Sequence, residues 1–190
     1  MRLFVGIEVP ETFKNELEGQ QASIKNQYPT VEWIDSSKWY VVLRFLGNPQ
    51  RKDRKNVISA VEKACQSVLP WKLSLGKIEC FPVGETVTRT IVASVKEQSF
   101  MLERFLKELD GNLSHCRVPA PSEDFTPHIV LARVQSDTSK GRLRRSAQML
   151  SLKALEAPVE HCVVVQSELS HEGPIYNIIT KQKFSAELAR

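Results

Sequence analysis

One strand motif occurs twice in this chain of 190 residues, and the repeat constrains the fold more than any other feature of the sequence. The segment 40–44 reads Tyr-Val-Val-Leu-Arg, and 128–132 reads His-Ile-Val-Leu-Ala. Both runs are short, apolar and rich in β-branched residues, as is typical of a buried strand. Thr126 and Pro127 lead into the second copy in an extended conformation, because the residue before a proline is disfavoured in the α region. The repeat predicts two similar strands in two similar structural units.

The segments around the two copies predict helices mixed with hairpins. Alternating apolar residues predict a first strand over 2–9, and apolar residues at helical spacing predict helices within 10–27, 53–69, 99–113 and 140–150. Two hairpins are expected over 71–95, with a bulge near Gly76, and over 159–184. We therefore expect one α+β domain over 1–190, with two pseudo-symmetric lobes whose antiparallel sheets face each other across a central cleft and whose helices lie outside.

Composition excludes several classes of protein. The four cysteines have no Cys-x-x-Cys spacing, which argues against a disulfide framework or a zinc ribbon and predicts buried free thiols. The adjacent pairs 115–116 and 161–162 are both His-Cys, but neighbours on a strand point to opposite faces, so no metal site is expected. A net charge of +4 argues against a protein that coats nucleic acid and is compatible with a local phosphate site.

No apolar run approaches the ~20 residues that span a bilayer, and the first residues lack the features of a signal peptide. We therefore expect a cytoplasmic monomer with no membrane partner. A basic segment over 140–145 allows two interpretations, a solvated helix face or a contact with nucleic acid.

His128 is the residue of the repeated motif that carries chemistry on its own. An imidazole titrates near neutral pH, so at a strand mouth it can serve as an acid or a base. A histidine at the start of a strand can equally be a satisfied structural residue. Its counterpart in the first copy is Tyr40.

Four segments in this order resemble the two-histidine phosphoesterases, in the branch of the RNA 2′,3′-cyclic phosphodiesterases that are also called 2′-5′ RNA ligases. They are the opening Arg2-Leu3-Phe4-Val5 with Pro10, the run Leu43 to Gly47, the run Thr126 to Arg133, and the pair of segments Glu168-Leu169-Ser170 and Gly173-Pro174-Ile175-Tyr176. The resemblance covers nearly the whole chain and implies the bilobal fold described above.

The resemblance also implies a chemistry and a set of site residues. In that family each core strand carries His-x-Thr-x, the two copies face each other, and no metal or cofactor is used. One histidine takes a proton from water and the other protonates the leaving ribose oxygen. Here His128 occupies the position of the proton acceptor and Tyr40 that of the donor, while Val42 and Val130 occupy the two threonine positions.

Three further residues are candidates for substrate binding. Strict alternation puts Arg44 on the same strand face as Tyr40, where it can meet a phosphate. Arg133 matches a family arginine associated with substrate, although strict alternation turns it away from His128. Tyr176 in the closing hairpin either stacks on a base or packs as a strand aromatic, and both interpretations stay open.

The resemblance implies an RNA 2′,3′-cyclic phosphodiesterase-like protein that opens a cyclic phosphate end to a 2′-phosphomonoester by metal-free acid/base chemistry. Its partner is RNA or a nucleotide with a cyclic phosphate end. Weakened activity is expected, because a general acid contributes ~10²- to 10⁴-fold and each valine removes a phosphate hydrogen bond of roughly 1.5–3 kcal/mol. The alternative is a non-catalytic protein that binds an RNA end or nucleotide in the same cleft.

Overall fold

The computed structural model describes residues 2–121, 125–170 and 173–185. Within these residues the strands are β1 Arg2–Glu8, β2 Glu32–Trp33, β3 Tyr40–Gly47, β4 Trp71–Phe81, β5 Thr90–Lys96, β6 His128–Arg133, β7 Glu156–Val159, β8 His161–Ser170 and β9 Gly173–Lys183. The helices are α1 Glu11–Lys25, α2 Arg54–Gln66, α3 Met101–Leu113 and α4 Arg142–Gln148, with a 3-10 turn at Ser36–Lys38.

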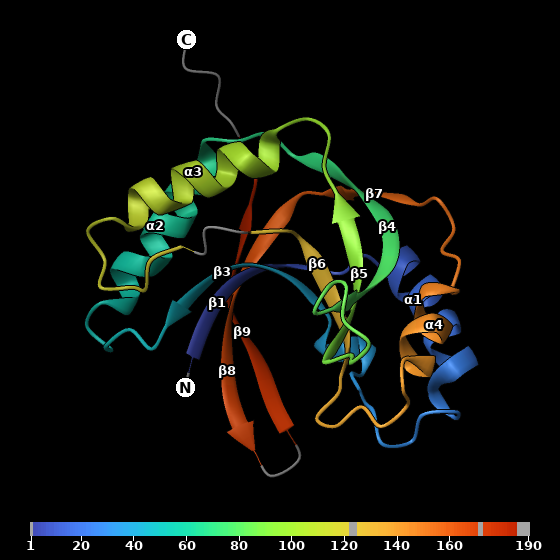
Figure 1. The fold of residues 1–190 in the computed structure, drawn as a ribbon. Helices are drawn as coiled ribbons and strands as arrows, with labels where there is room; N and C mark the ends of the chain where they lie inside the picture. The colour runs from blue at the N-terminus through green and yellow to red at the C-terminus, as the bar shows by residue number, and fades with distance from the viewer. Residues whose placement is uncertain (1, 122–124, 171–172, 186–190) are drawn as a thin grey trace.

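The described strands form one antiparallel sheet that curls like half of a barrel (Figure 1). Its order is β7-β4-β5-β6-β3-β1-β8-β9, and β2 also pairs with β6. The α+β class and the two lobes are confirmed. The two expected sheets are the two halves of this sheet, joined where Val41 of β3 lies opposite Ile129 of β6.

The helices cover the outer face of the sheet and leave the inner face free (Figure 1). Helix α2 packs against α3, β8 and β9 in the half that contains β3, which we call the N half. Helix α4 packs on β4 in the half that contains β6, which we call the C half. Helix α1 lies beside α4 in the C half, because the hydroxyl of Tyr28, just after α1, lies 2.8 Å from the Ser146 hydroxyl of α4.

The buried stripes of the helices agree with their predicted apolar spacing. In α3 the buried side chains are Leu102, Phe105, Leu109 and Leu113, and in α2 they include Val57, Val61 and Ala64. The strand β7 was not predicted, because Pro158 interrupts its pattern. It is tolerated since β7 lies at the edge of the described sheet, where it pairs with β4.

Two local predictions are wrong in detail. Ser99 is the residue whose type predicts a cap for the third helix, whereas the residue before α3 is Phe100, in a left-handed conformation at φ 61°. The hydroxyl of Ser99 instead bonds the Glu97 carboxylate. The cysteines are free as predicted, but Cys116 is only partly buried. No described helix is both long and apolar enough to cross a membrane.

Candidate active site

The two copies of the repeated strand share a β-bulge at the same position. On β3, Arg44 lies opposite Val5 and Val42 lies opposite Gly6, so Leu43 has no partner in this ladder. On β6, Ala132 lies opposite Ile91 and Val130 lies opposite Val92, so Leu131 has none there either. Each bulge falls three residues after the motif position, Tyr40 or His128. The two strands therefore share a backbone irregularity as well as a similar sequence.

Each bulge shifts the alternation of side chains by one residue, because the extra residue breaks the period of two. On β3 the consecutive residues Leu43 and Arg44 are both buried, and Phe45 is exposed. On β6 the consecutive residues Leu131 and Ala132 are both buried, and Arg133 is exposed. Before the bulges, the half-buried motif residues lie on the inner face of the sheet.

The two motif positions are neighbours on the inner face. Val41 pairs with Ile129, and counting on from this single pair in antiparallel register puts Val42 across from His128 and Tyr40 across from Val130. Tyr40 and His128 are therefore diagonal neighbours, and such pairs in an antiparallel ladder have Cα atoms roughly 7–8 Å apart. The pairing of these two residues in one site is compatible with this register and stays a prediction.

His128 is held in one orientation by the backbone that precedes it. Its Nδ1 lies 2.7 Å from the carbonyl oxygen of Thr126, two residues earlier. A carbonyl oxygen can only accept a hydrogen bond, so Nδ1 carries the proton in the neutral ring and Nε2 keeps its lone pair. The Phe81 ring flanks the imidazole with centroids 6.4 Å apart. The chain thus presents an imidazole with a free basic nitrogen on a partly exposed surface.

Tyr40 belongs to an aromatic cluster. Its ring makes edge contacts with Phe4 and Tyr176, with centroids 5.6 and 5.7 Å apart, and Phe4 also meets Tyr176 at 5.5 Å. Burial is the main cause that raises the pKa of the Tyr40 hydroxyl, and the nearby Glu8 and Tyr176 raise it further. Glu8 in turn pairs with Lys181 of β9 at 2.6 Å. Tyr40 stays protonated at neutral pH and is a weak proton donor.

The predicted placement of Arg44 on the inner face is wrong. Its side chain is only 7% exposed, and its Nε donates to the Asp110 carboxylate of α3 at 2.7 Å. The other guanidinium nitrogens donate to the carbonyl oxygens of Phe45, Pro119 and Ala120. The bulge at Leu43 is the physical reason, since it turns Arg44 outward. There it ties β3 to α3 and to the segment before β6.

Arg133 lies on the inner face, although strict alternation predicted that it turns away from His128. Val130 and Arg133 line one pocket of about 470 Å³, together with Glu32, Arg89, Thr90, Val134 and Gln135. The bulge at Leu131 explains the difference, because it returns Arg133 to the face of Val130. An exposed guanidinium therefore stands on the strand that carries His128.

Of the remaining candidates, Val42 and Tyr176 lie on the inner face of the N half and Val130 lies in the C half. Val42 and Tyr176 pack with Tyr40 around the buried Phe4, Val163 and Val165. Tyr176 is therefore a packed strand aromatic, and its partly exposed ring leaves base stacking open. Val130 is half-buried in the pocket of Arg133. Neither valine offers a hydrogen bond from its side chain.

Sequence reasoning missed two residues of the inner face. Phe45 is 64% exposed, and its ring lies 6.4 Å from that of Phe4. Arg89 lines the pocket of Arg133. Residues 129–132 are apolar throughout, so no break in alternation along the sequence marked the bulge. Nothing in the sequence marked Arg89, because it reaches the site only through strand pairing.

Comparison with known proteins supplies a family for this arrangement. The model of the 2′-5′ RNA ligase superfamily matches residues 40–170. The RNA 2′,3′-cyclic phosphodiesterase of Methanocaldococcus jannaschii is 25% identical over 180 residues, covering 94% of this chain and 98% of the relative. The protein of the same description from Thermus thermophilus is 27% identical over 197 residues, covering 100% of this chain and 93% of the relative.

Solved structures share the fold. A crystal structure of a protein from Thermus thermophilus covers 98% of this chain and 100% of its own, with a TM-score of 0.85 at 23% identity. The structure of E. coli LigT complexed with 3′-AMP covers 96% of this chain and 97% of its own, with a TM-score of 0.75 at 14% identity. At these identities the likeness concerns the fold alone.

Proposed function

Because the chain belongs to the 2′-5′ RNA ligase superfamily, we propose that it is an RNA 2′,3′-cyclic phosphodiesterase that hydrolyses a cyclic phosphate end to a 2′-phosphomonoester. The observation that carries this proposal is the orientation of His128. Its Nδ1 is committed to the Thr126 carbonyl oxygen, which leaves a basic Nε2 on the inner face.

In this reaction, His128 Nε2 takes a proton from a water molecule, and the water oxygen attacks the phosphorus. The bond between phosphorus and the ribose 3′ oxygen breaks, and that oxygen takes the proton of the Tyr40 hydroxyl. The tyrosinate then regains a proton from solvent, and His128 releases its own. The pairing of β3 with β6 at Val41 and Ile129 supports this assignment, because His128 and Tyr40 each lie one residue from that pair. We propose that the chain's own side chains carry out these proton transfers without a metal ion.

Arg133 is the proposed phosphate ligand. Its guanidinium is exposed on the strand of His128, and a charged donor stabilises the negative charge that grows on the phosphate oxygens. Val42 and Val130 add no donor, and the raised pKa of Tyr40, due first to burial, makes it a weak acid. We therefore propose a slow enzyme whose rate is limited by protonation of the leaving oxygen.

The relatives support an RNA substrate. Those from Methanocaldococcus jannaschii and Thermus thermophilus are described as RNA 2′,3′-cyclic phosphodiesterases, and LigT has been crystallised with 3′-AMP. An RNA substrate and four free cysteines fit the reducing cytoplasm that we propose as the location of this chain.

The second candidate function is a non-catalytic protein that binds an RNA end or a nucleotide on the same inner face. The aromatic and aliphatic floor around Tyr40 favours it, because this floor lacks a well-matched proton donor and can contact a base. In this case binding is salt-dependent and is weakened by Arg133→Ala without any turnover.

The test measures release of 2′-phosphomonoester from a short RNA that ends in a 2′,3′-cyclic phosphate. It compares this chain with the triple variant Tyr40→His, Val42→Thr, Val130→Thr, and with His128→Ala in both backgrounds. We expect slow turnover by the parent, faster turnover by the triple variant, and loss in both on His128→Ala. A parent rate equal to that of buffer would overturn the enzyme proposal, and turnover by the triple variant alone would then favour the binding protein.

A further inference from the structure

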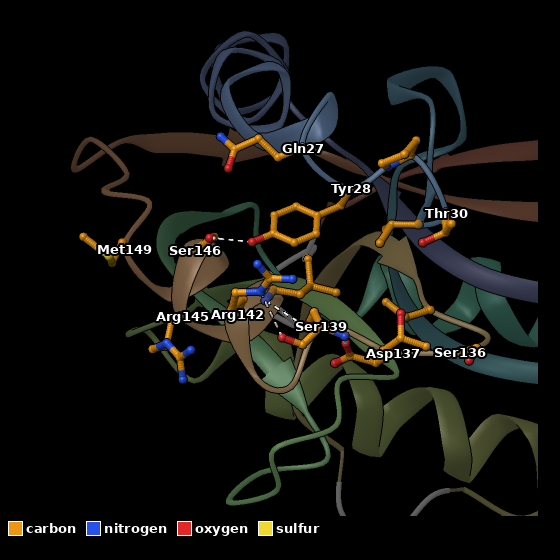
Figure 2. Close-up of a pocket in the computed structure, with 15 residues that line it drawn as sticks. Gln27, Tyr28, Thr30, Ser136, Asp137, Ser139, Arg142, Arg145, Ser146 and Met149 are labelled. Atoms are coloured by element: carbon orange, nitrogen blue, oxygen red, sulfur yellow. Dashed lines mark hydrogen bonds between the residues drawn. The ribbon is translucent and has the colours of Figure 1, made fainter.

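A second pocket lies in the C half, outside the residues that the chemistry uses. It has a volume of about 630 Å³ and lies between the end of α1, the loop after β6 and helix α4 (Figure 2). Its α1 side is Gln27–Val31, and its loop side is 136–139. Its α4 side is Arg142, Leu143, Arg145, Ser146 and Met149.

The charged side chains that line this pocket are two arginines and one aspartate, so their net charge is positive. Arg142 donates one hydrogen bond, from Nε to the Ser139 carbonyl oxygen, so its two terminal nitrogens face the pocket or solvent. Arg145 is exposed. The acidic group, Asp137, is already engaged, because one carboxylate oxygen accepts the Thr88 backbone N–H and the other that of Ser139. Guanidinium groups with spare donors suit phosphate oxygens.

The pocket also offers an aromatic surface and hydroxyls. The Tyr28 ring lines it and is fixed by the bond between its hydroxyl and Ser146 (Figure 2). Thr30 and Ser136 add hydroxyls. This combination of arginines, an aromatic ring and hydroxyls is suited to a nucleotide with its phosphate.

The pocket adjoins the one that holds Arg133. Val134 lines both pockets, and Gln135 of the first is followed directly by Ser136 of the second. Four arginines thus line two neighbouring pockets, Arg89 and Arg133 in the one on the inner face and Arg142 and Arg145 in the one beside α4, against the carboxylates of Glu32 and Asp137. A basic surface that leads away from a catalytic residue is suited to a single strand.

We propose that this surface, from Arg133 to Arg145, is a track for the phosphodiester backbone of the RNA strand upstream of its cyclic phosphate end. The proposal rests on the proposed phosphodiesterase function. Arg142 and Arg145 bind a phosphate of a nucleotide that the reaction does not touch. The track makes an oligonucleotide a better substrate than a cyclic mononucleotide, which is too short to reach α4.

The test compares substrates of increasing length, from a 2′,3′-cyclic mononucleotide to a ten-residue RNA with a cyclic phosphate end. The variant is Arg142→Ala with Arg145→Ala, and the matched control is Arg104→Ala with Lys107→Ala, which removes the same charge from exposed positions of α3. We expect the first variant to raise KM for the ten-residue RNA roughly tenfold to a hundredfold. The kcat of this variant and its KM for the mononucleotide should equal those of the parent. The control variant should have the parent KM for both substrates.

Equal KM changes for long and short substrates, or none for either, would overturn the track and leave the phosphodiesterase proposal standing. If the parent turns over neither substrate, that proposal fails, and the track is tested by fluorescence anisotropy with a ten-residue RNA ending in a 2′-phosphate. Loss of this phosphate contact should then lower the salt slope by about 0.7. An unchanged slope, or equally tight binding of 5′-AMP, would overturn the track.

Discussion

The two halves of the sheet carry the same strand and the same bulge, but their inner faces differ in chemistry. The C half presents His128 and Arg133, two groups that can handle a proton and a phosphate. At the corresponding positions the N half presents Tyr40 and Phe45, which pack in or beside an aromatic cluster. The same strand with the same bulge therefore supports a charged surface in one half and an apolar one in the other.

The difference shows that the scaffold and the chemistry are separable. The bulges, the strand pairing and the helices depend on buried residues such as Val41 and Ile129, which are alike in the two halves. The inner-face side chains contribute little to that core, so they can change without altering the fold. In the proposed reaction the C half holds the base and the phosphate ligand, and the N half limits the rate.

The largest expected effect is on the base. His128→Ala should lower kcat for the cyclic phosphate substrate by ~10²- to 10⁴-fold, because the water molecule loses its proton acceptor. The measurement is single-turnover release of 2′-phosphomonoester, with thermal melting to check the fold. His115→Ala, at an exposed position after α3, is the matched control and should keep the parent rate. A variant His128→Ala that retains half of the parent activity would contradict the proposed role.

The next effect concerns the donor in the N half. Tyr40→His should raise kcat by up to ~10²-fold, since an imidazolium is an acid matched to neutral pH. Tyr40→Phe keeps the ring in the aromatic cluster and removes only the hydroxyl, so it should lower kcat by roughly tenfold. Initial rates at saturating substrate measure both. An unchanged rate for Tyr40→Phe would assign the proton donor to another group.

Arg44, in the N half, is expected to contribute to the free energy of unfolding and not to catalysis. Asp110→Ala leaves the buried guanidinium of Arg44 without its carboxylate, and removing one partner of a buried ion pair costs about 3 kcal/mol in the free energy of unfolding. Urea denaturation measures this loss. Glu11→Ala removes the exposed pair with Lys14 and should cost below about 0.5 kcal/mol. Equal losses in the two variants would contradict the structural role of Arg44.

Arg133→Ala should weaken substrate binding and leave stability unchanged. A charge-assisted bond to phosphate contributes roughly 1.5–3 kcal/mol, which corresponds to about a tenfold to hundredfold rise in KM. Phe45→Ala changes the corresponding position of the N half, and its effect on KM should be severalfold smaller because a phenyl ring makes no bond to phosphate. Steady-state kinetics separates the two. A larger effect for Phe45 would reverse the assignment of phosphate binding to the C half.

The smallest effect is on the shape of the pH profile. Burial, and then Glu8 and Tyr176, raise the pKa of Tyr40 above its ordinary value of about 10. The protonated donor is present below the raised pKa and is lost only as the pH rises through it. The parent rate should therefore show no alkaline fall between about pH 7 and 9. Tyr40→His should introduce a fall near pH 6.5, the ordinary pKa of histidine.

Much of the fold was predictable because local patterns agree with the tertiary structure. The apolar stripes of α2 and α3 and the final hairpin were predicted at nearly the observed bounds. The bulge near Gly76 is confirmed by a register shift between Leu75 and Ile78. A side chain at Gly76 would collide with Ser94, so only glycine fits there. A position that only glycine can occupy is predictable, because the residue type alone indicates the close backbone approach.

The site was less predictable, because its residues were placed by strand register. Counting residues from Tyr40 or His128 put Arg44 inside and Arg133 outside, and the bulges exchanged those assignments. Arg89 and the pocket beside α4 arise from segments far apart in the sequence. No local pattern indicates a pairing between strands, since it depends on the partner as much as on the strand.

The sequence by itself determined the repeated strand, the family and the identity of the residues at the motif positions, because these follow from residue type and spacing along one chain. The tertiary structure decided which side chains share the inner face. It also decided which nitrogen of His128 is free and why the pKa of Tyr40 is raised. Those properties depend on neighbours from other strands and on burial, and these neighbours and this burial exist only in the folded sheet.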